Sequence, residues 1–208
     1  MSKRKSLVYI VDDDVSVCRA LKLLLESHGF RVEAFTRAAG FLAFKHTCVP
    51  SCLILDIQLP DINGLALQEA MAARGLTIPI VFITGHGDIP MSVKGMKAGA
   101  VDFLPKPFTK KKLLDAVRLA IVKSKVQSKE QAGIAKIKRR IKTLSPRELE
   151  VFRFVAKGML NKQIAWKRGT ALQTIKVHRA RVMQKMQAKT VTELIGFARK
   201  AGIIPSRY

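Results

Sequence analysis

From Leu7 to Lys123, short apolar runs alternate with longer segments in which apolar residues recur at helical spacing. The runs predict strands at Leu7–Val11, Val32–Phe35, Leu53–Asp56, Ile80–Thr84 and Val101–Leu104. The segments between them predict helices at Val15–His28, Ala38–Phe44, Leu65–Arg74, Pro90–Ala98 and Lys111–Lys123. This alternation predicts an α/β domain with a doubly wound, five-stranded parallel sheet. The nearly continuous apolar runs LVYIV, LILD and IVFIT fit strands buried on both faces.

The pattern from Leu144 onward is entirely helical and predicts four helices. The first, in SPRELEVFRFVAKG, has Ser145 as its N-cap, with Pro146 and Glu148 in its first turn. Asn161 is the predicted cap of the second helix, and Thr190 or Thr192 that of the fourth. The second and third helices, joined by a turn at Gly169, predict a helix-turn-helix within a small all-α domain.

Between these parts lies a polar, strongly basic stretch, SKVQSKEQAGIAKIKRRIKT. We interpret it as the domain boundary, with domains at residues 5–123 and 142–205 and a basic linker at 124–141. The linker is either flexible or helical, and a helix that continues from the preceding one is slightly favoured in its first half.

Charge is the strongest signal in the composition. The 208 residues carry 38 basic and 15 acidic side chains, a net charge of +23. Residues 1–124 hold 17 basic and 11 acidic side chains, whereas residues 125–208 hold 21 and 4. The excess in the smaller, C-terminal part indicates a polyanionic partner, and nucleic acid is the leading candidate. An anionic membrane surface would require an amphipathic helix with large apolar anchors.

The remaining composition argues for a cytoplasmic protein. No run of eighteen apolar residues could span a membrane, and the apolar stretch Leu7–Val11 is too short for a signal peptide. Three cysteines without a Cys-x-x-Cys motif do not suggest disulfides. A metal cluster of HTCVPSC with His46 is a weak alternative to ordinary thiols near a strand.

Polar groups gather where the predicted strands end. Asp12 and Asp13 end the first strand, Asp56 the third and Thr84 the fourth, and Lys106 follows the fifth. In a parallel sheet these ends share one edge, where ligands bind. Two carboxylates about 4 Å apart repel by about 4 kcal/mol at an effective dielectric near 20. A divalent cation with oxygen ligands such as Mg²⁺ relieves that repulsion, and an opposing hydroxyl and ammonium suit phosphoryl oxygens.

The motifs VDDD, LILDIQLPDING, VFITGHGD and DFLPKPF, in this order, resemble a two-component receiver domain with a flavodoxin-like fold over about residues 5–123. The resemblance implies that Asp56 is the phospho-acceptor. It implies that Asp12, Asp13, Asp56 and the main-chain carbonyl of Gln58 hold Mg²⁺ (or Mn²⁺).

Further roles in this domain follow from the same resemblance. Thr84 and Lys106 grip the phosphoryl group, Phe103 is the aromatic switch residue, and the peptide bond from Lys106 to Pro107 is cis. We expect the side chains of Gln58 and His86 to set the lifetime of the phosphorylated form. Asp14 lies outside this set and is interpreted as a helix N-cap or as outer-shell solvation.

The C-terminal motifs LSPRELEVFRFVAKG, NKQIA and TIKVHRARVMQKM resemble the LuxR-type DNA-binding domain. The whole chain thus resembles a NarL/FixJ-family response regulator, closest to the FixJ branch. In the third helix, Ile175, Val182 and Met186 are predicted to pack inward. Lys176 and Val177 are candidates for base-edge contacts, and Arg179 and Arg181 for phosphates. The remaining DNA-binding candidates are Thr174, Lys185, Asn161 and Lys162.

Several positions depart from the LuxR-type pattern. Arg168 stands where the family usually has an apolar residue, and Ala171 stands where it usually has a Ser or Thr cap. Leu172 replaces a polar residue, and Thr170 is the alternative cap. Trp166 is unexpected on a short DNA-binding helix. These changes bear on the geometry and base preference of the recognition helix.

The resulting hypothesis is a non-enzymatic, phosphorylation-dependent transcription regulator. A sensor histidine kinase would phosphorylate Asp56, and the protein would form a homodimer and bind promoter DNA, with RNA polymerase as a further partner. Two alternatives remain: a constitutive DNA-binding protein with a vestigial receiver, and an aspartate-nucleophile phosphatase. The full acidic set argues against the first. Gln58 stands where the second needs a carboxylate.

Overall fold

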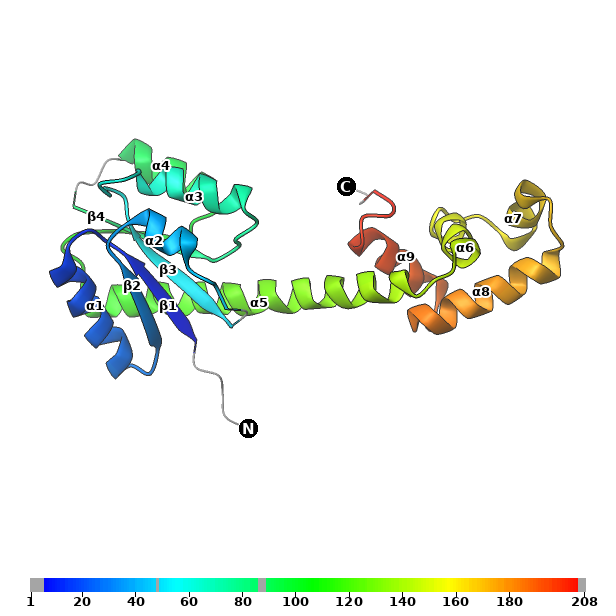
Figure 1. Cartoon of the computed structure of the whole chain (residues 1–208), viewed down its shortest axis with the longest axis horizontal. Helices are drawn as coiled ribbons and strands as arrows, with labels where there is room; N and C mark the ends of the chain where they lie inside the picture. The colour runs from blue at the N-terminus through cyan, green and yellow to red at the C-terminus, as the bar shows by residue number, and fades with distance from the viewer. Residues whose placement is uncertain (1–5, 48, 86–88, 206–208) are drawn as a thin grey trace. The chain divides into compact units, whose positions relative to one another are not determined.

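The computed structural model describes residues 6–47, 49–85 and 89–205 and divides into two compact units, Met1–Ser128 and Lys129–Tyr208 (Figure 1). Each unit is described by itself. Over the described residues, no helix is both long enough and apolar enough to cross a membrane.

The N-terminal unit contains a five-stranded, all-parallel sheet. Its strands are β1 (Leu7–Val11), β2 (Arg31–Phe35), β3 (Ser51–Asp56), β4 (Ile80–Thr84) and β5 (Asp102–Pro105), in the spatial order β2-β1-β3-β4-β5. Strand β1 lies between β2 and β3, and its Ile10 pairs with Ala34 of β2 and with Ile54 of β3. The predicted fold class is therefore confirmed, with strand limits that shift by no more than two residues.

Alternate side chains of each strand pack against different helices. Val8 and Ile10 of β1 join a cluster with α1 (Val15–Ser27) and the first half of α5 (Lys110–Lys142). Tyr9 and Val11 join a second cluster on the opposite face. That face is covered by α2 (Ala38–Ala43), α3 (Gly64–Ala73) and α4 (Ile89–Lys97). Burial on both faces explains why these strands are continuous apolar runs.

Helix α5 is much longer than the sequence pattern predicts. The predicted helix ends at Lys123, but α5 continues to Lys142 through the stretch interpreted as a linker. That stretch lacks proline and is rich in Lys, Arg, Gln and Ala, which all favour helix. Near its end, Ile137 is buried in the core of the C-terminal unit.

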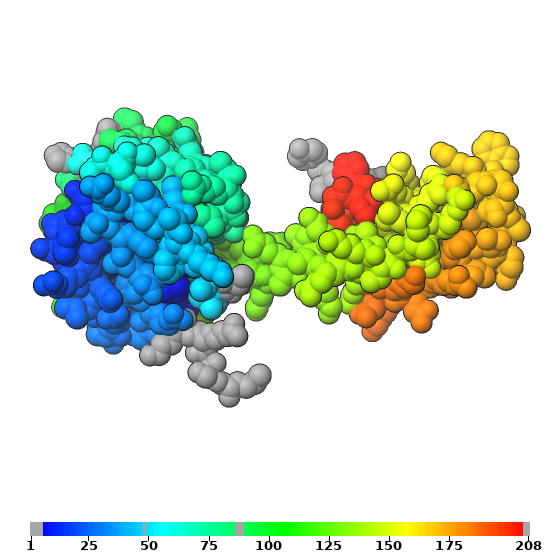
Figure 2. Space-filling view, viewed as in Figure 1, coloured from blue at the N-terminus to red at the C-terminus, as the bar shows by residue number. Residues whose placement is uncertain are grey.

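The C-terminal unit continues with α6 (Pro146–Ala156), α7 (Asn161–Arg168), α8 (Leu172–Met186) and α9 (Val191–Lys200). In Figure 2, α8 (orange) forms a continuous outer surface of this unit. The core includes Phe152, Ile164 and Leu194, together with the three residues of α8 predicted to face inward: Ile175, Val182 and Met186.

Two predicted helix caps of this unit are confirmed and two are wrong. Ser145 caps α6 in a capping box with Glu148, and Thr190 caps α9. Asn161 is instead the first residue of α7, where the side chain of Gln163 accepts a hydrogen bond from the N–H of Leu160 (2.8 Å). Thr170 does not cap α8 either.

Candidate functional site

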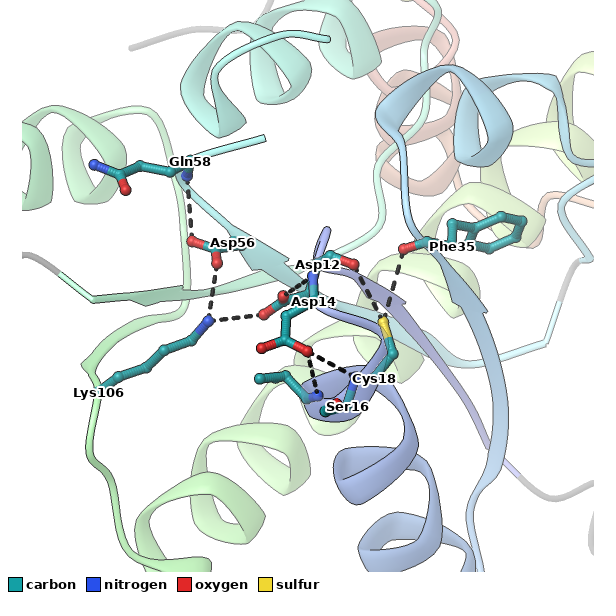
Figure 3. A network of polar contacts seen from close by, with 9 residues as sticks. Asp12, Asp14, Ser16, Cys18, Phe35, Asp56, Gln58 and Lys106 are labelled. Carbon is teal, nitrogen blue, oxygen red and sulfur yellow. Dashed lines mark hydrogen bonds and ion pairs between the residues drawn. The ribbon is translucent and has the colours of Figure 1, made fainter. Parts of the chain in front are cut away.

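Side chains from three strand ends of the N-terminal unit meet at one edge of its sheet (Figure 3). Asp12 follows β1, Asp56 ends β3 and Lys106 follows β5. The ammonium of Lys106 donates to Asp12 Oδ2 (2.8 Å) and to Asp56 Oδ2 (2.9 Å). The structure therefore brings together two of the predicted carboxylates and the predicted ammonium.

Burial makes this cluster electrostatically demanding. Asp12 is fully buried, Asp56 is 6% exposed, and the Lys106 side chain is 26% exposed. Burial raises the pKa of Asp12, although the hydrogen bond from Lys106 acts in the opposite direction. Burial alone would lower the pKa of Lys106, but its bonds to Asp12 and Asp56 raise it above the ordinary value. The ammonium thus stays protonated between its two carboxylates.

A third carboxylate completes a set that fits a hard cation. One oxygen each from Asp12, Asp13 and Asp56 lies within 4.8 Å of the other two, and Asp13 is exposed to solvent. Three carboxylates around one ammonium leave an excess of negative charge. All-oxygen donors of this kind are what Mg²⁺ and Mn²⁺ prefer. The residues present therefore fit the predicted metal.

The other predicted receiver residues are placed around this cluster. The N–H of Gln58 donates to Asp56 Oδ1 (3.2 Å), and the Gln58 side chain points away from that carboxylate (Figure 3). Thr84 is buried at the end of β4, and its carbonyl accepts from the N–H of Lys106 (2.6 Å). Phe103 lies on β5 with its ring 6.1 Å from that of Phe82. His86 lies outside the described residues.

Asp14 has a structural task, as one of its two interpretations expected. Its carboxylate caps α1 by accepting from the N–H groups of Ser16 (2.7 Å) and Val17 (3.3 Å). Its own N–H donates to Asp12 Oδ1 (2.9 Å). The expected cis peptide bond between Lys106 and Pro107 is also present. The VDDD run thus divides into ligand candidates and a helix cap.

Two supporting residues were missed by sequence reasoning. The Cys18 thiol donates to the carbonyl of Asp12 (3.3 Å) from the first turn of α1. Gly64 starts α3 so close to β3 that a Cβ there would lie 2.5 Å from the Asp56 carbonyl oxygen. The glycine stands in the motif LPDING, which could have revealed it. The cysteine gives no signal of its own.

The C-terminal unit presents most of the predicted DNA contacts on the open face of α8. Thr174, Lys176, Val177 and Arg181 are exposed there. Arg179 is half-buried and donates from Nη1 to Asn161 Oδ1 (2.7 Å), which links α8 to α7.

Lys185 is used differently from the other candidates. Its ammonium donates to Glu148 Oε2 (2.6 Å) and to the Thr143 carbonyl (3.2 Å). The hydrogen bond from Lys185 lowers the pKa of Glu148, and the bond from the N–H of Ser145 lowers it further. This lysine therefore holds α8 against the start of α6.

The structure shows where the residues that depart from the LuxR-type pattern lie in the helix-turn-helix. Arg168 donates to Glu150 Oε1 of α6 (2.6 Å), so the basic side chain forms an ion pair where an apolar residue is usual. Ala171 is the N-cap of α8 and makes no side-chain hydrogen bond. Trp166 is 87% exposed. Leu172 is half-buried beside the core of this unit.

Two family models match the chain. The model described as a response regulator receiver domain matches residues 8–118, and that of the bacterial regulatory proteins of the luxR family matches residues 142–198. Similar proteins include nodulation protein W of Bradyrhizobium diazoefficiens, which is 45% identical over 96% of this chain and 88% of its own length. The transcriptional regulatory protein FixJ of Azorhizobium caulinodans is 39% identical over 96% and 94%.

Solved structures agree with these matches. The response regulator StyR, 41% identical, superposes with a TM-score of 0.78 over 94% of this chain and 99% of its own. Full-length FixJ from B. japonicum, 37% identical, gives a TM-score of 0.56 over 98% and 100%.

Proposed function

Since the chain belongs to the response regulators that join a receiver domain to a LuxR-type DNA-binding domain, we propose that phosphorylation of Asp56 controls its binding to promoter DNA. The chain is a transcription regulator of a two-component system, and its family is non-enzymatic. Support for the switch comes from three clustered carboxylates, two of which bond to the ammonium of Lys106, at the carboxyl edge of the sheet. That charge imbalance favours a metal ion and a phosphoryl group.

The phosphoryl step needs only positioning and charge neutralisation. One oxygen of Asp56 attacks the phosphorus of a phosphohistidine in a sensor kinase. The new P–O bond forms as the P–N bond breaks, and the imidazole nitrogen keeps the electron pair. Lys106 moves its ammonium from the carboxylates to the phosphoryl oxygens, and the hydroxyl of Thr84 binds another of them.

Asp12, Asp13, Asp56 and the carbonyl of Gln58 would hold a magnesium ion, which would further neutralise the charge of the phosphoryl oxygens. Release of phosphate requires a water molecule that attacks the phosphorus. We expect Gln58 and His86 to set the rate of this step. The protein thus phosphorylates itself from the donor and loses the group slowly.

Phosphorylation of Asp56 alters the surface formed by α4, β5 and α5. The new charge draws Thr84 inward and lets Phe103 repack, which changes this face. The face carries partly exposed apolar side chains suited to a second copy, at Val93, Met96, Leu119, Val122 and Val126. We therefore assign dimerisation to it, together with release of the DNA-binding domain.

The recognition helix is α8, placed in the major groove. Lys176 and Val177 read base edges. Contacts to the phosphates come from Thr174, Arg179, Arg181, Asn161 and Lys162. Lys185 is left out of this surface because Glu148 holds its ammonium. A two-fold dimer would bind an inverted repeat in the DNA. The protein would act in the cytoplasm, and RNA polymerase is a further partner.

Labelling with radioactive acetyl phosphate tests this proposal. The full chain with Mg²⁺ should take up one phosphoryl group, form a dimer by sedimentation and bind operator DNA more tightly. Asp56→Asn, which keeps the size of the side chain, should remain unlabelled and monomeric. Continuous phosphate release would indicate an enzyme. Absent labelling, or labelling without a change in DNA affinity, would contradict the switch.

A further inference from the structure

The DNA-binding domain carries exposed apolar side chains on and beside α7 that its core does not use. Trp166 on α7 is 87% exposed, and Leu160, just before α7, is 67% exposed. Ile164 and Ala165 supply the buried side of the same helix. Trp166 lines a groove of about 540 Å³ together with Met159, Lys162, Gln163 and Lys167, which we call the Trp166 groove. An open tryptophan of this kind marks binding surfaces more often than it serves stability.

The groove opens beside α6, whereas the proposed DNA surface lies on α8. The ammonium of Lys167 stands 5.4 Å from the centre of the Phe154 ring of α6. Asn161, at the start of α7, faces the other way and accepts from Arg179 of α8. The indole thus projects from the part of α7 that is left free when α8 enters the major groove.

Charge indicates what the groove binds. Lys162 and Lys167 line it, and among the described residues that line it there is no carboxylate. The two carboxylates of α6 are bonded to other side chains, Glu148 to Lys185 and Glu150 to Arg168. An occupant must therefore bring its own negative charge.

We infer that the Trp166 groove docks an acidic protein segment that seats an apolar side chain against the indole and pairs a carboxylate with Lys167, while Lys162 lies at the border with the proposed DNA surface. DNA also brings negative charge, but its outer surface is lined by phosphates and offers little apolar area to bury a tryptophan. A peptide segment supplies both kinds of contact.

Trp166 is the chain's single tryptophan, so its fluorescence reports on this groove alone. The probe is a synthetic helical peptide rich in Asp and Glu, with Leu and Phe on one face and no tryptophan. Added to the full chain, it should move the emission to shorter wavelength and saturate. A control peptide with Ala in place of Leu and Phe should leave the emission unchanged.

Variants give an independent readout through the anisotropy of a labelled peptide. Trp166→Ala should weaken binding by about tenfold or more, as for an aromatic hot-spot residue. Lys167→Ala should cause a smaller loss that disappears at high salt. Leu23→Ala, at another exposed apolar residue on α1, should leave binding unchanged. Trp166→Ala should keep the affinity for operator DNA and the labelling of Asp56, which separates this inference from the phosphorylation switch.

Three outcomes would overturn the inference. A blue shift with duplex DNA, accompanied by weaker DNA binding of Trp166→Ala, would assign the groove to the DNA surface. A shift with vesicles of anionic lipid but not with the peptide would assign it to a membrane. An unchanged emission with every probe would show that the tryptophan docks nothing of this chemistry.

Discussion

The acidic site of the receiver domain and the ion pairs of the DNA-binding domain both join carboxylates to basic side chains, but they differ in charge balance. In the receiver, Asp12 and Asp56 share the ammonium of Lys106, and Asp13 lies beside them without a bond to it. In the DNA-binding domain, Glu148 has Lys185 as its own partner. A balanced pair can serve as permanent architecture, whereas an excess of buried or crowded charge is stable only when a ligand neutralises it.

The same contrast applies to the surfaces. Exposed cations on α8, such as Lys176 and Arg181, have no comparable need for an internal partner because they remain in water. They become useful when phosphates replace their counterions. Each domain therefore keeps its paired charges for folding and its unbalanced charges for a ligand of opposite sign.

The largest expected effect comes from removing the lysine of the acidic site. Lys106→Met should lower the free energy of unfolding of the receiver domain by about 3 kcal/mol, because the buried carboxylate of Asp12 loses its oppositely charged partner. Added Mg²⁺ should return more stability to this variant than to the unsubstituted chain, since the carboxylates then depend on the metal alone. Calorimetry of the full chain in EDTA and in Mg²⁺ measures both effects.

A matched control for this variant is Lys94→Met. Lys94 pairs with Glu69 at 3.7 Å, and both side chains are 67% exposed. The loss of such a surface pair should cost less than about 1 kcal/mol and show no dependence on Mg²⁺. Equal stabilisation of Lys106→Met and Lys94→Met by the metal would remove the distinction drawn between the two kinds of site.

A smaller loss is expected at the balanced pair. Glu148→Gln should lower the stability of the DNA-binding domain by about 2 kcal/mol, because the ammonium of Lys185 loses its ion pair and bonds only to an uncharged amide oxygen. Lys185→Met in addition should add little, since both variants remove the same interaction. The measurement is a double-mutant cycle by thermal unfolding. A response of this pair to Mg²⁺ would contradict its assignment as permanent architecture.

The effect of acid on the stability of the DNA-binding domain through Glu148 should be smaller than the effect of Glu148→Gln at neutral pH. The pKa of Glu148 is lowered by Lys185, so the folded state binds the proton less readily than the unfolded chain, where the ordinary value is 4.5. Its contribution is thus complete above that value and is lost as pH falls through the folded pKa. Unfolding followed between neutral pH and pH about 3 should show a steeper loss for the unsubstituted chain than for Glu148→Gln. Parallel curves would disprove the role of Glu148.

The acidic site was predictable from sequence to a degree that the balanced pairs were not. Apolar runs fix where strands end, and parallel pairing then brings Asp12, Asp56 and Lys106 to one edge whatever the details of packing. The partners of Lys185 and Arg168 depend on how long, flexible side chains reach between packed helices. No periodicity specifies that, so Lys185 was assigned to DNA and the ion pair of Arg168 was not foreseen.

Helix ends show the same limit. Ser145 was predictable because a complete capping box stands in the sequence. The start of α7 was assigned to Asn161, but the chain enters the helix at Leu160, whose N–H is satisfied by Gln163. For α5, good helix formers continue past the predicted end. Ile137 is buried in the core of the C-terminal unit, and such packing stabilises the second half of this helix.

The smallest expected effect is a gain of stability at the start of the recognition helix. Ala171 occupies the N-cap of α8 in an extended conformation and supplies no side-chain acceptor. Ala171→Ser should stabilise the DNA-binding domain by about 1 kcal/mol, because a hydroxyl can accept from an otherwise unpaired N–H of the first turn. Ala171→Gly separates capping from backbone effects, and thermal unfolding measures both. If the serine variant gains stability but loses affinity for DNA, the uncapped N-terminus of α8 is part of the DNA-binding surface. If DNA affinity is unchanged, the missing cap is a purely local loss of stability that the ion pairs beneath α8 offset.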